Sequence, residues 1–259
     1  MTRDLDSLTS WHADWRGGLR VAVLGLSVTG FSVADTLAEL GADVLVLSES
    51  ATEEYERLVP LIGAQLWIGD LGSVPARLQE FAPEVVIASP GFSPAHPVIA
   101  WTAQSIPLWG DVELAWRVRD KVLRADGTAA EWVFITGTNG KTTTTQLTAT
   151  MLVAGGLRAA PCGNIGVPVL DAVRDQGGFD VLVVELSSHQ LWYLGLTDPR
   201  RSRCRGPRPA STSPTTTSSG TAAQRRTARR RPWCTATPAS PASTTRPMLR
   251  PSAWSRMPT

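Results

Sequence analysis

The chain has 259 residues, which is room for two domains of ordinary size, and its 42% hydrophobic content can supply a substantial core. Its formal net charge of +2 is unevenly distributed, because all 23 acidic residues but only 12 of the 25 basic residues lie in residues 1–198. Three scattered cysteines argue against a disulfide scaffold, and the lack of a long apolar run argues against a signal peptide or a membrane span, so we expect a cytoplasmic protein without membrane contact.

The first 124 residues alternate between strand and helix patterns. A short apolar run at residues 20–25 predicts a buried parallel strand, and further strands are predicted at residues 44–47, 65–68, 85–88 and 107–109. Helices are predicted at residues 31–40 and 111–119. This alternation is typical of an α/β fold in which helices cover both faces of a parallel sheet, so we interpret residues 1–124 as a Rossmann-like domain.

A second α/β pattern follows the polar stretch at residues 124–130. A strand at residues 132–136, a glycine-rich turn, a helix at residues 142–154 and a buried strand at residues 181–185 predict part of a P-loop central domain over residues 125–198. Residues 199–259 differ, since they contain 13 Arg, many Pro, Ser and Thr, one Leu and no Val, Ile, Phe or Tyr. So little apolar surface cannot offset the entropy cost of ordering, and we predict that this tail is disordered.

The strongest local signal is Thr136-Gly-Thr-Asn-Gly-Lys-Thr-Thr143, between the predicted strand and helix. Glycines let the backbone wrap a phosphate chain, and the following helix directs its positive dipole end at the same phosphates. Lys141 would reach the β- and γ-phosphates, and the hydroxyl of Thr142 would ligate Mg²⁺. The alternative, a glycine turn that binds nothing, fits the Gly-Lys-Thr sequence less well. The predicted nucleotide-binding residues are Gly137, Thr138, Asn139, Gly140, Lys141, Thr142 and Thr143.

Glu185 ends the last predicted strand, at the edge where an open α/β sheet places its ligands. A lone Glu after a strand is usually an ordinary polar residue. Because a P-loop lies upstream and Mg²⁺ prefers carboxylate ligands beside phosphate oxygens, the pattern favours a metal-binding role.

A second glycine turn, Gly25-Leu-Ser-Val-Thr-Gly30, also joins a predicted strand to a helix. It resembles a dinucleotide fingerprint, but Ser48 stands where an acidic ribose ligand is expected, which argues against a nicotinamide cofactor. The diphosphate of another nucleotide fits this helix terminus better. The loop Ser89-Pro-Gly-Phe-Ser-Pro94 either closes the domain or lines a ligand, and the residues alone leave both open. His189 has no partner motif, which favours a local structural role.

Taken together, these blocks resemble the Mur ligases, the ATP-dependent amide-forming enzymes of peptidoglycan precursor synthesis. The resemblance covers residues 20 to about 198 and favours the branch that joins D-glutamate to UDP-N-acetylmuramoyl-L-alanine through an acyl phosphate. Other Mur-type ligases and folylpolyglutamate synthase are the alternatives. Besides the P-loop, the matching blocks are Ser89-Pro-Gly91 with Gly110-Asp-Val-Glu113, Gly163-Asn-Ile-Gly-Val-Pro168 and Glu185-Leu-Ser-Ser-His-Gln-Leu191.

The resemblance implies ATP and Mg²⁺ as cofactors. Lys141, Glu185 and Asn164 would be the catalytic residues, and Thr142 and Glu185 would be the metal ligands. Asn164 would contact the substrate near its reacting carboxyl group, and the turn at residues 25–30 would hold the UDP diphosphate. The implied substrate-binding residues are Gly25, Leu26, Ser27, Val28, Thr29, Gly30, Ser48, Ser89, Pro90, Gly91, Asn164 and Ser187.

Beyond about residue 198 the resemblance stops. The family continues with a metal-binding His, a carbamylated Lys and a D-glutamate-binding domain, whereas His189 and Lys141 are the last His and Lys here. We therefore expect a truncated ligase with little or no turnover. One hypothesis is that the tail is the family's continuation read out of frame, since back-translated family-like segments read one base late reproduce residues 213–221 and 230–238. The weaker alternative is a genuine Arg-rich arm that binds nucleic acid.

Overall fold

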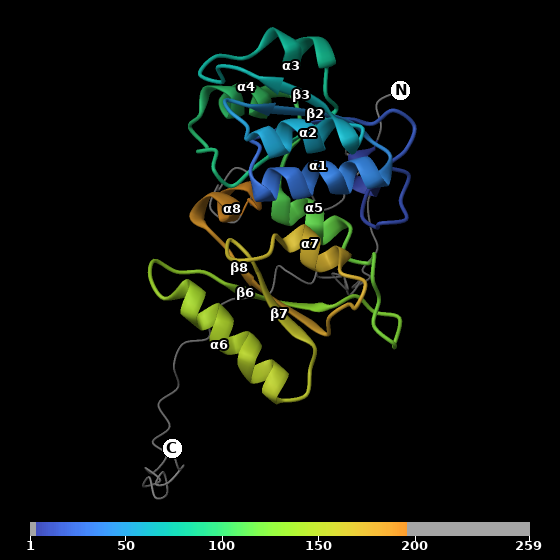
Figure 1. Ribbon diagram of the computed structural model, residues 1–259, viewed down its shortest axis with the longest axis vertical. Coiled ribbons are helices and arrows are strands. Elements are labelled where there is room, and N and C mark those ends of the chain that lie inside the picture. Colours follow the sequence, from blue (N-terminus) through green and yellow to red (C-terminus); the bar gives the residue numbers. More distant parts are fainter. Residues whose placement is uncertain (1–3, 196–259) are drawn as a thin grey trace, which may run out of the picture. The chain divides into compact units, whose positions relative to one another are not determined.

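The computed structural model describes residues 4–195 of the chain (Figure 1). The predictions about residues 199–259, namely disorder, an out-of-frame origin and an Arg-rich nucleic-acid-binding arm, lie outside the described residues. Within residues 4–195, no helix has the length and apolar character that crossing a membrane requires.

A five-stranded parallel sheet forms the first half of the described chain. Its strand order is β3-β2-β1-β4-β5. Strands are added to one side of β1 up to β3 and to the other side from β4, so the strand order reverses between β1 and β4, where open α/β sheets bind their ligands. The predicted parallel α/β fold is confirmed. The strands are β1 (Arg20–Leu24), β2 (Asp43–Ser48), β3 (Gln65–Ile68), β4 (Val85–Ala88) and β5 (Leu108–Gly110).

Helices cover both faces of this sheet. Val21 and Val23 of β1 pack in a core with residues of α1, α2 and α5, whereas Ala22 and Leu24 pack in another core with residues of α3 and α4. Successive strand residues point to opposite faces, so these two cores lie on the two sides of the sheet, as predicted. Besides a 3-10 helix at Leu5–Ser7, the helices are α1 (Val28–Leu40), α2 (Glu53–Leu61), α3 (Ala76–Phe81), α4 (Pro97–Ser105) and α5 (Asp111–Arg117).

The second sheet has three parallel strands in the order β6-β8-β7. Helix α6 covers one face, where Ala149 packs with Val181 and Val183 of β8 (Figure 1). The alternate β8 residues Leu182 and Val184 join α7 and α5 in the core that also covers one face of the first sheet. The elements are β6 (Glu131–Ile135), α6 (Lys141–Ala154), β7 (Ala159–Gly163), α7 (Val169–Arg174), β8 (Val181–Glu185) and α8 (Ser188–Tyr193).

Most predicted elements are present with small shifts at their ends. Helix α1 begins at Val28, three residues earlier than predicted, and the backbone oxygen of its N-cap, Ser27, accepts from the N–H of Phe31 at 2.8 Å. Helix α5 ends at Arg117, two residues before the predicted end. Helices α2, α3, α4, α7 and α8 and strand β7 were not predicted from the sequence.

Candidate functional site

The P-loop connects β6 to α6 and is open to solvent. Residues 136–140 are all exposed, and α6 begins at Lys141 directly after Gly140. The Nζ atom of Lys141 donates to the carbonyl oxygen of Gly137 at 3.0 Å, so the side chain folds back over its own loop. The first N–H groups of this 14-residue helix therefore face the exposed loop, where an anion is stabilised.

Glu185 lies at the end of β8, the central strand of the second sheet, beside the ends of β6 and β7. Glu185 is 2% exposed. The Oγ1 hydroxyl of Thr142 donates to Glu185 Oε2 at 2.9 Å, and Nδ2 of Asn164 donates to Glu185 Oε1 at 3.1 Å. Residues from the P-loop helix and from the loop after β7 thus meet on one buried carboxylate.

The conformation of Gly163 explains why Asn164 reaches Glu185. Gly163 has a φ of +101°, and a Cβ atom there would lie 2.6 Å from the backbone oxygen of Glu185. The missing side chain lets the backbone N–H of Asn164 donate to that same oxygen at 3.0 Å. A glycine is therefore required to bring the two strand ends this close.

The chemistry of this cluster suits a hard divalent cation. The two hydrogen bonds to Glu185 come from a hydroxyl and an amide, both neutral, so the buried carboxylate can still accept a cation. Carboxylate and hydroxyl oxygens are ligands that Mg²⁺ accepts. Within residues 4–195 no group of three or more His, Cys, Asp or Glu residues could hold a metal, so phosphate and water oxygens would have to complete the coordination shell.

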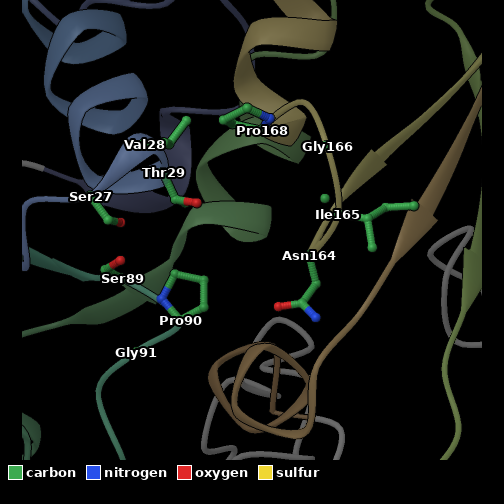
Figure 2. Close-up of a pocket in the computed structure, with 11 residues that line it drawn as sticks. Ser27, Val28, Thr29, Ser89, Pro90, Gly91, Asn164, Ile165, Gly166 and Pro168 are labelled. Carbon is green, nitrogen blue, oxygen red and sulfur yellow. The ribbon is translucent and has the colours of Figure 1, made fainter. Parts of the chain in front are cut away.

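A separate cavity of about 200 Å³ opens between the two sheets (Figure 2). It lies at the carboxyl ends of β1 and β4, where the strand order of the first sheet reverses. Three loops line it: residues 27–29 at the start of α1, residues 89–91 after β4, and residues 163–166 with Pro168 after β7. Asn164 belongs to this lining and also contacts Glu185, so it connects the cavity with the Thr142–Glu185 pair that suits a cation.

The turn before α1 is tightly folded. A Cβ atom on Gly30 would lie 2.0 Å from the backbone oxygen of Gly25, so only glycine lets the first turn of the helix pack on the loop. The start of α1 faces the cavity through Val28 and Thr29, and its first turn carries no acidic residue. This helix terminus can therefore receive a diphosphate.

The structure separates the predicted substrate-binding residues into two groups. Those that line the cavity are Ser27, Val28, Thr29, Ser89, Pro90, Gly91 and Asn164. The other five, Gly25, Leu26, Gly30, Ser48 and Ser187, do not line it. Ser48 is 7% exposed and its Oγ accepts from the backbone N–H of Leu26 at 3.3 Å, while Ser187 caps α8.

Four cavity residues were absent from the predicted site: Gly163, Ile165, Gly166 and Pro168. All belong to the block at residues 163–168, in which Asn164 was the one residue predicted to bind substrate. These residues could have been predicted from Gly166 and Pro168, because glycine and proline so close together indicate a turn or loop.

Comparisons with known proteins find one matching family and several similar relatives. Residues 135–199 match the Mur ligase middle domain family. Over 194 residues the chain is 61% identical to the UDP-N-acetylmuramoylalanine–D-glutamate ligase of Leifsonia xyli subsp. xyli, an alignment that covers 73% of this chain and 37% of that protein.

Proteins of the same name are similar in other organisms. The relative from Tropheryma whipplei (strain Twist) is 50% identical over 191 residues, covering 73% of this chain and 38% of that protein. The relative from Streptomyces avermitilis is 42% identical over 188 residues, covering 71% and 37%. The chain thus spans well under half of the length of each of these relatives.

Proposed function

We propose that this chain carries the nucleotide-binding part of an ATP-dependent amide ligase, because residues 135–199 match the Mur ligase middle domain. The proposed reaction joins D-glutamate to UDP-N-acetylmuramoyl-L-alanine through an acyl phosphate, in peptidoglycan precursor synthesis. The names and identities of the relatives support this choice of substrates. We expect the reaction in the cytoplasm, because ATP and UDP-sugars are made there.

The P-loop would bind ATP. The N–H groups of residues 137–143 and the start of α6 would surround the phosphates, and Lys141 would leave the Gly137 carbonyl to contact them. Thr142 and Glu185 would hold Mg²⁺, which neutralises charge on a transferring phosphoryl group. A carboxylate is a poor electrophile, so this activation step is what permits attack by an amine.

The cavity between the sheets would bind the UDP-linked substrate. The start of α1 would stabilise the diphosphate, and the loop at residues 89–91 would form the opposite wall. On this proposal, residues 1–124 form the UDP-substrate domain and residues 125–198 the ATP domain.

The position of Asn164 is the single observation that carries the proposal. Its side chain lines the cavity and also donates to Glu185 at 3.1 Å. A carboxyl group bound beside Asn164 would therefore lie next to the cation and the γ-phosphate, which is the proximity that acyl phosphate formation needs.

Binding is the direct test, because the alignments cover only 37–38% of the relatives' length. Calorimetry on the full chain would measure Mg²⁺ with the non-hydrolysable analogue AMP-PNP, and separately UDP-N-acetylmuramoyl-L-alanine. We expect both to bind. Lys141→Ala should weaken AMP-PNP binding by about tenfold or more while leaving the UDP ligand unaffected.

The exposed Arg57→Ala variant is the matched control, since it also removes a positive charge, but from α2 and not from the P-loop. It should bind both ligands as the wild-type chain does. A wild-type chain that binds neither Mg²⁺-AMP-PNP nor UDP-N-acetylmuramoyl-L-alanine would overturn the proposal.

A further inference from the structure

Helix α8 follows the second sheet in sequence but packs on the first. Tyr193 is 4% exposed and belongs to the core that lies between the first sheet and helices α3 and α4. A Cβ atom on Gly110, at the end of β5, would lie 2.9 Å from Tyr193 Cβ, so the tyrosine is pressed against that strand. Helix α8 therefore connects the two sheets physically.

Two side chains of α8 hold the loop that follows β4. The hydroxyl of Tyr193 donates to the backbone oxygen of Phe92 at 2.9 Å, and Nδ1 of His189 lies 3.1 Å from the backbone oxygen of Pro90. A carbonyl oxygen can only accept, so Nδ1 of His189 carries the proton in this contact. The same loop supplies residues 89–91 to the cavity wall.

The N-cap of α8, Ser187, follows Glu185 by only two residues and is held in place by hydrogen bonds. Ser187 and Gln190 form a capping box, in which Gln190 Oε1 accepts from the backbone N–H of Ser187 at 2.9 Å. The N–H of Leu186, the residue after Glu185, donates to the backbone oxygen of Ile135 at 2.8 Å. Gln190 Nε2 also donates to the buried Asp111 of α5 at 2.8 Å.

We propose that Tyr193 and His189 are positioning residues, which hold the Pro90–Phe92 wall of the cavity in register with Glu185. The inference rests on the proposed function, because it assigns the two anchored points to a UDP-substrate wall and a metal ligand. Transfer between two bound substrates is sensitive to their relative placement, and a six-residue helix tied at both ends fixes that placement without long flexible side chains.

Tyr193→Phe tests the proposal because it removes one hydroxyl and keeps the buried ring. We expect UDP-N-acetylmuramoyl-L-alanine to bind about fivefold more weakly, the effect of one neutral hydrogen bond, with Mg²⁺-AMP-PNP binding unchanged. Tyr55→Phe, on α2, is the matched control and should change neither affinity. A merely structural hydroxyl would lower the unfolding temperature without changing the ratio of the two affinities.

His189 supplies the second arm. His189→Ala should weaken the UDP ligand by a similar factor, and His189→Gln should restore part of the affinity because its amide N–H can donate to the Pro90 carbonyl. Unchanged UDP-ligand binding in both Tyr193→Phe and His189→Ala would overturn this inference and leave the proposed function standing. A wild-type chain that binds neither ligand would overturn both.

Discussion

Thr142 Oγ1 and Glu185 Oε2 lie 2.9 Å apart although 43 positions separate them in the chain. The parallel pairing of β6 with β8, which sets Ile135 opposite Glu185, brings them together. The hydroxyl and the carboxylate are thus prearranged before any ligand binds, so little reorganisation is needed to hold a cation.

Glu185→Gln should remove the metal dependence of nucleotide binding. The amide keeps the shape of the side chain but loses the charge that would hold Mg²⁺, so AMP-PNP affinity in Mg²⁺ should fall about tenfold or more, to the value measured in EDTA. Calorimetry in the two buffers measures this. Glu80→Gln, an exposed change on α3, is the control, and an unchanged Mg²⁺ effect in Glu185→Gln would exclude the metal role.

Gly163→Ala should destabilise the protein and separate Asn164 from Glu185. Its φ of +101° strains any L-residue, and the new Cβ would lie 2.6 Å from a backbone oxygen. Gly156→Ala has comparable strain, with a φ of +89°, but meets no atom within 4 Å. Urea denaturation should show about 1 kcal/mol lost for Gly156→Ala and at least about 2 kcal/mol more for Gly163→Ala. Equal losses would contradict the close approach.

Asp111 should make stability depend on pH in an unusual direction. Burial raises the pKa of Asp111 to about 6 from 3.8, although hydrogen bonds from Gln190 and the backbone act the other way. The folded protein therefore keeps a proton that the unfolded chain has released between about pH 4 and 6, so the contribution of Asp111 to the free energy of unfolding falls as the pH rises through this window.

Asp111→Asn mimics the protonated form and should be more stable than the wild type at about pH 8, by up to about 3 kcal/mol. The advantage should vanish near about pH 4, as urea denaturation at both values would show. The exposed Asp70→Asn is the control. A stability difference that is the same at both pH values would show that Asp111 does not titrate in this window.

Arg174→Ala should loosen α7 from α1. The guanidinium pairs with Asp35 at 2.6 Å and Glu39 at 2.9 Å, and the Arg174 side chain is 18% exposed. Burial raises the pKa of Glu39, but Lys121 and Arg174 outweigh it and the net pKa is lowered. A lowered pKa gives stability that is present at neutral pH and lost as the pH falls through it.

We expect Arg174→Ala to cost about 1–2 kcal/mol at neutral pH, with a smaller cost in acid and in high salt. Arg57→Ala removes an ion pair whose side chains are 74% and 91% exposed, so it should cost less than about 0.5 kcal/mol. Urea denaturation at two ionic strengths distinguishes the two. Equal costs would mean that Arg174 contributes no more than a surface pair.

The strands of the first sheet were predictable from the sequence, because short runs of apolar residues are a clear signal for strands. The predicted strands at residues 65–68 and 85–88 coincide with β3 and β4. Strand β7 was missed, since Ala159–Gly163 contains Pro161 and no β-branched residue. It lies at an edge of its sheet, where proline is tolerated, and only its pairing with β8 identifies it.

The site was predictable in its parts and not in its assembly. The P-loop and Glu185 carry recognisable patterns, but the pattern cannot show that Gly163 pairs with Glu185 or that Asn164 lines a cavity between two sheets. Helix α8 had a usable signal in the spacing of Ser187 and Gln190, which form the capping box. Its packing on the first sheet depends on long-range contacts that no local pattern encodes.

The burial of Tyr193 between β5 and the loop after β4 has a practical consequence for dissection of the chain. A recombinant fragment that stopped at the polar turn near residue 124 would lack Tyr193 and would expose the apolar residues that pack against its ring. Split-protein designs and crystallisable fragments should therefore retain the chain through Tyr193, since part of the core beneath the first sheet is supplied by a helix that follows the second sheet.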